Sequence, residues 1–462
     1  MIVKLRKLAK RIPGARVLNK LRIRAQNRLR TWLRDRLIDI SVWNYRLPQL
    51  LTPQHLLSIP TVHTVGDALV HFHYTKLLGE EQRRPVFCLT PDAFPSNVYV
   101  NFMFSKEEYA IYSELIYDRI LTNLPEKFWI DYWLLEKLKR KFQRYSPLQS
   151  YKAGFSKEYD PIYMQIKDEN SRFAEAYLAI RANDNKFEAF QDYQRLLLEK
   201  WDGNPTRFPG FSEEYRAKLY EKLGLKGKYV CLHVRLYPDQ GPYAYDPQKE
   251  TDPRGIQKFE NYIPVVELLT ARGYQVLQMG TRDERRLPDI CGYVDYANSD
   301  YQNIFNDLHL VSGCTFFIGS KSGPEMFAAL FRKPILGLNY SCLNAMLEVP
   351  ELRFYPKTVT DRSGRALPIL EILNHEVYYS QSPDPYNQHG LRTVDLTPDE
   401  LVEATKEMLK LVEDPATDWT HRTELQKEFR RIIRPEHLDL YKALGAPCDC
   451  YLRKVMLITR ES

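Results

Sequence analysis

The chain has 462 residues, about three times the length of a typical single domain, so two packed domains are expected. Hydrophobic residues make up 44% and charged residues 27% of the chain, which excludes disordered, collagen-like and disulfide-scaffold proteins. No apolar run reaches the roughly 18 residues of a membrane-spanning helix, and we expect no secretory signal. Most of the seven cysteines sit in apolar runs, so buried reduced thiols are expected.

Positive charge is concentrated near the amino-terminal end. The formal net charge is +7, yet residues 1–40 hold thirteen Lys or Arg against two Asp. Apolar residues recur there at spacings of three and four between arginines, which predicts an amphipathic helix on an anionic membrane surface. We therefore assign residues 1–44 to a membrane-facing arm and expect a cytoplasmic protein, peripheral on the inner face of the cell membrane. A helix docked on the body is the alternative, and no nucleic-acid partner is predicted.

Residues 45–210 are predicted to form an amino-terminal acceptor domain with a helical insertion. Its first elements are a strand over residues 60–65, a turn at Gly66 and a helix from Asp67, followed by a strand in RRPVFCLTP. Residues 105–201 have a helical pattern that includes Tyr109 and Tyr112. The loop DGNPTRFPG, residues 202–210, is predicted to be the interdomain linker.

Residues 211–375 alternate strand and helix patterns, which predicts a parallel sheet with crossover helices. The expected strands lie in KYVCLHVR, YQVLQMG, GYVDYA, CTFFIGS and, as the last one, PILGLN. Residues 376–462 are predicted to be a carboxyl-terminal helical extension that starts with a capping box at Thr397 and Glu400. The predicted fold class is α/β, with two Rossmann-like domains facing across a cleft.

An anion-binding turn is predicted where CTFFIGS runs into SKSGPE. Backbone N–H groups at a helix start near Pro324, with the hydroxyls of Ser320 and Ser322, suit a diphosphate. The segment is not a GxxxxGK[ST] loop, and no GxGxxG follows any strand. The alternative is an ordinary turn capped by one of the two serines.

A second set of candidates lies on the strand VCLHVR. His233 and Arg235 alternate along it, so they project to the same face near its carboxyl end. Ligands bind beyond the carboxyl ends of open parallel sheets, and a guanidinium matches phosphate oxygens with two hydrogen bonds. Arg235 is therefore predicted to hold a phosphate. The alternatives are a buried Arg235 paired with Asp295 or Asp307, and a core histidine at position 233.

From about Phe211 onward the chain resembles bacterial glycosyltransferases of surface-carbohydrate synthesis. The matching segments are EEYRAKLYEKLGL, VCLHVR, RGYQVLQMG, DYANS, CTFFIGSKSG, LTPDELVEATKEM and IIRPEHLDLY. Gln278 departs from the basic residue usual in that family before Met. HVR also resembles the HxRRxD strand of fucosyltransferases, in which the first Arg holds the donor diphosphate, although Leu236 replaces the second Arg.

TVGDAL resembles the GD turn of heptosyltransferases, in which the Asp acts as general base. The resemblance makes Asp67 the candidate base, with capping of its own helix as the alternative. His63 is the second candidate, because an imidazole titrates near neutral pH.

Together these resemblances imply a GT-B type glycosyltransferase, inverting and metal-independent. Its partners would be a nucleotide-diphosphate sugar and a glycan or lipid-linked acceptor, with no other cofactor; a hexosyl, heptosyl or fucosyl donor stays open. A non-catalytic nucleotide-sugar or lipid-headgroup binding protein is the alternative. No metal site is predicted, since the CDC motif of Cys448 and Cys450 has no second pair at zinc spacing. The expected donor-binding residues are His233, Arg235, Gly280, Asp295, Tyr296, Ser320, Lys321, Ser322, Gly323 and Glu325.

Overall fold

The computed structural model describes thirteen stretches of the chain: residues 56–58, 65–91, 96–106, 108–112, 186–236, 253–256, 258–281, 286–341, 343, 349–375, 377, 383–433 and 445–461. The predicted arm at residues 1–44, the candidate base His63 and most of the predicted helical insertion lie outside them. The backbone of Asp67 is described, but its side chain is not. Two compact units divide the chain, and residues 63–77, 101–105 and 185–462 belong to the larger one.

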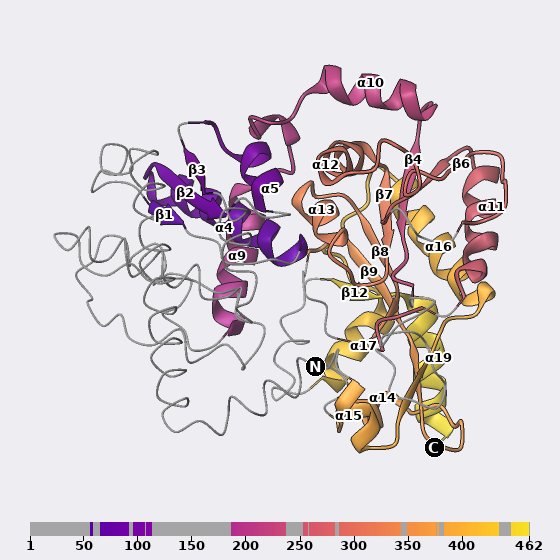
Figure 1. Ribbon diagram of the computed structural model, residues 1–462. Coiled ribbons are helices and arrows are strands. Elements are labelled where there is room, and N and C mark those ends of the chain that lie inside the picture. Colours follow the sequence, from indigo (N-terminus) through magenta and orange to yellow (C-terminus); the bar gives the residue numbers. More distant parts are fainter. Residues whose placement is uncertain are drawn as a thin grey trace, which may run out of the picture. The chain divides into compact units, whose positions relative to one another are not determined.

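The smaller unit contains a three-stranded parallel sheet in the order β1-β2-β3 (Figure 1). Its strands are β1 (Leu56–Ser58), β2 (Val86–Pro91) and β3 (Tyr109–Tyr112), with Leu56 paired to Val86 and Cys88 to Tyr109. The helical prediction for Tyr109 and Tyr112 is therefore wrong. A four-residue segment is too short to distinguish the period of a strand from that of a helix, and pairing with β2 decides it.

The predicted turn at Gly66 is also wrong. Helix α4 (Val65–Gln82) begins one residue earlier and takes Val65, Gly66 and Asp67 into its first turn. β1 lies upstream of the predicted strand, since it covers Leu56–Ser58. Asp67 is thus the third residue of a helix.

The larger unit is built on a seven-stranded sheet in the order β12-β9-β8-β7-β4-β5-β6, with every neighbouring pair parallel (Figure 1). The α/β class with a central parallel sheet is thereby confirmed. Its strands are β4 (Tyr229–His233), β5 (Gln275–Gln278), β6 (Tyr293–Val294), β7 (Phe316–Gly319), β8 (Ile335–Tyr340), β9 (Leu352–Pro356) and β12 (Ala446–Pro447). Numbered from β4 along the chain, this is the doubly wound order of dinucleotide-binding folds.

PILGLN, predicted as the last strand, is β8, and the sheet continues beyond it. β9 pairs with β8, and β12 pairs with β9 at the edge of the sheet. The chain therefore returns to the sheet at residues 446–447. β9 was not predicted because it carries the charged residue Arg353, which is buried and donates to the carbonyls of Pro350 and Leu352. β12 has two residues, too few for any periodic pattern.

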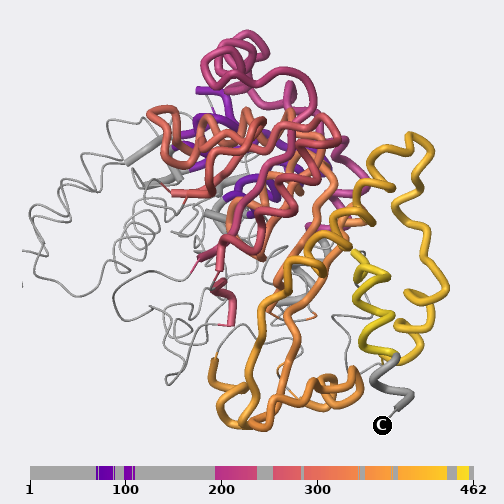
Figure 2. Tube along the Cα trace, turned by 90° about the vertical axis from the view of Figure 1, so that its right-hand side faces the viewer, coloured from indigo at the N-terminus to yellow at the C-terminus, as the bar shows by residue number. Residues whose placement is uncertain are grey.

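Helices cover both faces of the large sheet. Figure 1 shows α12 (Ile304–Gly313) and α13 (Glu325–Leu330) on one side and α11 (Ile263–Ala271) and α16 (Pro398–Glu413) on the other. α19 (Asp449–Glu461) packs against α16 and α17 (Glu424–Ile432), and Figure 2 shows this yellow segment beside them. The core between these helices and the sheet includes Val230, Leu232, Val266, Leu269, Leu401, Met408, Leu452 and Val455.

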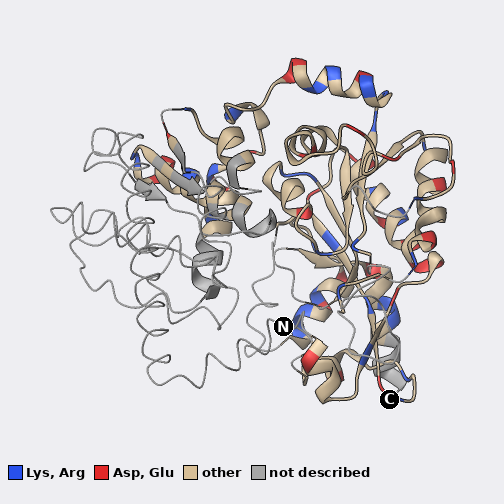
Figure 3. Ribbon diagram, viewed as in Figure 1, with Lys and Arg blue, Asp and Glu red and all other residues tan. Residues whose placement is uncertain are grey.

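Sequence signals for the helix ends are confirmed at two helices. α10 (Glu213–Leu223) is capped by Ser212 and ends at Gly224, which has a φ of +66°. Acidic and basic residues both occur along it (Figure 3), and Lys218 pairs with Glu214 at 2.6 Å. α16 begins with the predicted capping box of Thr397 and Glu400.

Further short elements complete the described ranges. They are α5 (Ser96–Met103), α9 (Lys186–Lys200), η2 (Pro205–Arg207), η3 (Phe259–Tyr262), α14 (Ile369–Leu373), α15 (Pro383–Gln388) and the antiparallel pair β10 (Thr358–Thr360) and β11 (Arg392–Val394). Residues 202–210, predicted as a linker, lie within the larger unit. Phe208 in this segment is buried against Trp201 and Phe102.

Candidate functional site

The doubly wound sheet has one switch point, between β4 and β7. From β4 the chain moves to β5 and β6 on one side, and from β7 it moves to β8 and β9 on the other. The crossover helices therefore diverge at the carboxyl ends of β4 and β7, and ligands of open α/β sheets bind in this crevice. His233 and Gly319, the last residues of the two strands, are paired there.

His233 and Ser322 meet at the switch point. The imidazole Nδ1 of His233 lies 2.7 Å from the Oγ of Ser322. Burial, with a smaller effect from the Arg235 guanidinium, lowers the pKa of His233 to about 4, so the ring is neutral at neutral pH. When its proton sits on Nδ1, the imidazole donates to Ser322 and leaves the serine O–H available for a ligand oxygen.

Ser320 fixes the backbone that carries Arg235. The Arg235 N–H donates to the Oγ of Ser320 over 2.7 Å, and the Arg235 carbonyl accepts from the N–H of Ile256 over 2.9 Å. The arginine side chain is half-buried. Because the serine oxygen is the acceptor in its bond, the hydroxyl proton of Ser320 is not used there.

Lys321 and Glu325 hold the shape of the turn. Lys321 has a φ of +53°, a left-handed conformation that costs a residue with a Cβ about 1–2 kcal/mol. Its N–H donates to Oε2 of Glu325 over 3.1 Å, and the Tyr340 hydroxyl donates to Oε1. Burial raises the pKa of Glu325 to about 7. Glu325, expected to bind the donor, is only 3% exposed and accepts hydrogen bonds at both oxygens inside the protein.

The helix after this turn starts later than predicted. Pro324 is the N-cap and α13 begins at Glu325. The N–H groups of Glu325 and Met326 donate to the carbonyls of Ser322 and Gly323, so they are already used within the turn. The side chains of Ser320, Ser322 and Arg235 therefore stay candidates for a phosphate, and the N–H groups of Glu325 and Met326 do not.

Three further predicted residues follow β5 and β6. Gly280 has a φ of +145°, a conformation that favours glycine. Asp295 accepts from the Nε of Arg286 over 3.0 Å. Tyr296 is buried and donates to Asp307 over 2.6 Å, and burial raises the pKa of Asp307 to about 7. Asp295 and Asp307, the suggested partners of Arg235, thus both have other partners.

A buried polar network at the ends of β8 and β9 had no sequence signal. Asn339 donates to the Tyr262 hydroxyl over 3.0 Å and accepts from the N–H of Leu396 over 2.7 Å. Lys357 donates to the carbonyl of Gly255 over 2.6 Å and pairs with Asp395 at 2.8 Å. Asn339 has a φ of +57° at an irregularity of β8, which alternating patterns do not predict.

Comparisons with known proteins give structural similarities at low sequence identity. No protein-family model matches the sequence, and no curated protein matches it. Among solved structures, the chain is similar to ADP-heptose LPS heptosyltransferase II of E. coli, with 13% identity, 78% of this chain and 100% of that chain covered, and a TM-score of 0.40. It is also similar to a family 9 glycosyl transferase of Veillonella parvula, with 11% identity and a TM-score of 0.41. That match covers 78% of this chain and 98% of the other. Similarity at this level leaves the activity to be inferred from the chain's own residues.

Within the described residues, no helix combines the length and apolar character needed to cross a bilayer.

Proposed function

We propose that the protein is a glycosyltransferase that moves a sugar from a nucleotide-diphosphate donor to a glycan or lipid-linked acceptor in bacterial surface-polysaccharide synthesis. The observation that carries the proposal is the meeting of His233, Ser322 and the Ser320–Arg235 pair at the switch point of a doubly wound sheet. The motifs VCLHVR and CTFFIGSKSG, which carry the family resemblance, are the segments that form this point.

The donor diphosphate would lie beyond the ends of β4 and β7. Arg235 would bind it with charge-assisted hydrogen bonds, and the hydroxyls of Ser320 and Ser322 would add two donors. These groups would stabilise the negative charge that develops on the leaving nucleoside diphosphate. The Lys321 N–H bonds the Glu325 carboxyl group across the turn, so the part of these two residues would be to hold the turn in position.

The acceptor hydroxyl would be deprotonated by Asp67 or His63, in a single displacement that inverts the anomeric centre without a metal ion. A base in α4 or just before it is supported by the resemblance of TVGDAL to the GD turn. The basic segment of residues 1–40 would hold the enzyme on the inner face of the membrane, close to a lipid-linked acceptor.

The decisive experiment is a panel of nucleotide sugars, scored for donor hydrolysis and for transfer. We expect at least one donor to be consumed. Binding of a donor without turnover would favour the non-catalytic binding protein, and the absence of both binding and turnover across the panel would contradict the proposal. Asp67→Asn then tests whether Asp67 is the base. If it is, the variant should transfer sugar about a hundred to ten thousand times more slowly, because general-base assistance is lost, while donor affinity should be unchanged.

The first variant to test is Arg235→Ala. Loss of a charge-assisted partner should weaken nucleoside diphosphate binding by roughly 2 kcal/mol, about thirtyfold, as measured by calorimetry. Arg272→Ala is the matched control, because Arg272 is an exposed arginine that pairs with Glu413 on the surface. Equal affinity of wild type and Arg235→Ala, with the fold intact by circular dichroism, would give Arg235 a purely structural role.

A further inference from the structure

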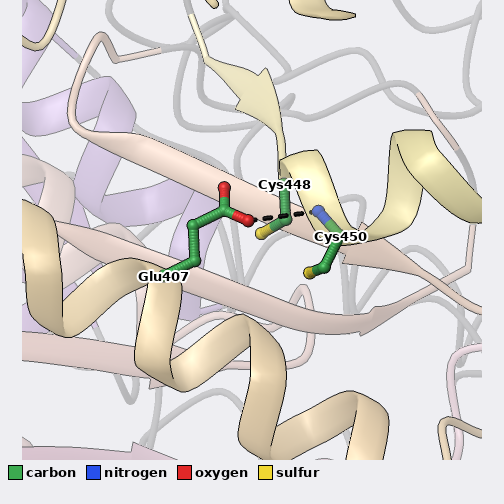
Figure 4. Close-up of side chains that lie close together, drawn as sticks. All are labelled: Glu407, Cys448 and Cys450. Carbon is green, nitrogen blue, oxygen red and sulfur yellow. Dashed lines mark hydrogen bonds between the residues drawn. The ribbon is translucent and has the colours of Figure 1, made fainter.

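Three side chains with metal-binding atoms lie together at the outer side of the large sheet. Cys448 directly follows β12, Cys450 lies in the first turn of α19, and Glu407 reaches them from α16 (Figure 4). Each contributes one ligand atom, and the three atoms lie within 4.8 Å of one another. β8 and β9 separate this cluster from β7, so it is distinct from the switch point.

The spacing and chemistry suit a thiophilic divalent ion. Zinc binds sulfur at about 2.3 Å and carboxylate oxygen at about 2.0–2.2 Å, so its tetrahedral ligands lie roughly 3.3–3.8 Å apart. The three ligand atoms, all within 4.8 Å of one another, lie close to that separation. Cys448 is fully buried, whereas Cys450 and Glu407 are only partly buried, which leaves a route for an ion.

The carboxylate is held in place by the backbone. The N–H groups of Asp449 and Cys450 donate to Oε1 and Oε2 of Glu407 over 2.9 and 3.2 Å. Metal-binding carboxylates are themselves usually hydrogen-bonded, which fixes their orientation. These bonds also satisfy N–H groups at the start of α19, so an experiment must separate capping from ligation.

We propose that Glu407, Cys448 and Cys450 bind one divalent ion of the zinc class, with a water molecule in the fourth position. The ion joins α16, β12 and α19, which come together only in the folded chain. Metal binding therefore stabilises the fold, independently of any sugar transfer.

The test uses the full-length protein, stripped with a chelator and kept reduced by a phosphine. Titration with Co²⁺ should produce thiolate-to-cobalt charge-transfer absorption that saturates at an equimolar amount, and Zn²⁺ should displace it. Zn²⁺ should also raise the melting temperature. No charge-transfer band, or a band without saturation at equimolar metal, would overturn the proposal.

Variants assign the site. Cys450→Ser is the preferred one because Cys450 is partly exposed, and it should lower Co²⁺ affinity more than the 10–100-fold typical of a lost outer partner. Glu407→Gln keeps one oxygen, which can accept from one of the two α19 N–H groups, but loses the charge and the second acceptor. Weaker metal binding with an unchanged circular dichroism spectrum therefore supports ligation over capping. Cys291→Ser is the matched control, since Cys291 is an exposed free thiol elsewhere. Affinity lost in Cys291→Ser, or retained in Cys450→Ser, would contradict the assignment.

Discussion

Two sets of polar side chains lie at the carboxyl edge of the same parallel sheet, and they differ in how much of their bonding capacity the protein uses. At the ends of β4 and β7, the Ser320 oxygen accepts one backbone N–H and Ser322 shares one bond with His233. At the ends of β8 and β9, Asn339 bonds two neighbours, and Lys357 bonds a carbonyl and a carboxylate with its side chain 2% exposed.

The difference separates the proposed binding surface from the network that supports it. Hydroxyls whose protons are not used inside the protein can still donate to a ligand, so the switch point keeps capacity for a phosphate. A buried ammonium group that already bonds protein atoms contributes to holding segments of the chain together rather than to ligand binding. Lys357 joins the ends of β9 and β11 to Gly255, one residue before the Ile256 that bonds Arg235. The β8–β9 network thereby holds the loop that supports Arg235.

The largest effect is expected for Lys357→Met. The substitution keeps much of the side-chain volume but removes the ammonium group that pairs with Asp395, whose side chain is 11% exposed, and this costs about 3–5 kcal/mol of unfolding free energy. Urea denaturation measures it. In the double variant Lys357→Met with Asp395→Leu, most of the loss should be recovered, because replacing both members of a buried pair by apolar residues is often neutral. If the single variant loses less than about 1 kcal/mol of unfolding free energy, the ion pair behaves like one exposed to water. The difference between the β8–β9 network and the switch point would then disappear.

The contrast also marks what the sequence predicts and what it does not. VCLHVR and CTFFIGSKSG end buried strands in polar residues, and that local pattern predicts that His233, Arg235, Ser320 and Ser322 lie at strand ends. Strand order, in contrast, depends on contacts between distant parts of the chain. β7 pairs with β4 rather than with β6, the strand before it in the sequence, and β12 pairs with β9. Neither follows from local periodicity.

The buried network escaped prediction for a related reason. Asn339 lies in the left-handed region inside β8, so the strand register shifts between Leu338 and Tyr340. The shift accompanies a close approach of the Tyr340 ring to Gly337, where a Cβ would lie 2.3 Å from it. Alternation rules place side chains on faces only while the register holds, so the bond from Tyr340 to Glu325 carried no sequence signal.

A smaller effect is expected for Glu325→Gln, and it depends on pH. Burial raises the pKa of Glu325 in the folded state to about 7 from the ordinary 4.5. Between these values the folded state holds a proton that the unfolded state has lost, so stability falls as pH rises, by at most about 1.4 kcal/mol per pH unit. Gln resembles the neutral carboxyl group, so the variant should lose this slope and gain stability relative to wild type as pH rises from 5 to about 7.

Denaturation at several pH values measures the difference between the two proteins. Asp307, whose pKa is also raised to about 7, contributes the same slope to both and cancels. Parallel stability profiles for wild type and Glu325→Gln would show that Glu325 ionises in the fold as freely as in water. The turn at Lys321 would then not depend on a protonated carboxyl group.

The smallest effect, and the one that sharpens the contrast most, is expected for Ser320→Ala. The substitution removes the acceptor of the Arg235 N–H and one candidate hydroxyl for the diphosphate. We expect a loss of about 1 kcal/mol in stability and, by calorimetry, roughly tenfold weaker nucleoside diphosphate binding, because one donor is lost and Arg235 is held less firmly. Ser312→Ala is the control: this buried serine of α12 bonds the His309 carbonyl and Arg216, so its loss should lower stability by a similar amount and leave nucleotide affinity unchanged. If both variants weaken binding equally, the effect comes from general loosening of the fold. If neither variant weakens binding, Ser320 supports the sheet edge in the same way as Asn339 and Lys357. Arg235 and Ser322 would then be the groups left at the switch point to bind a phosphate.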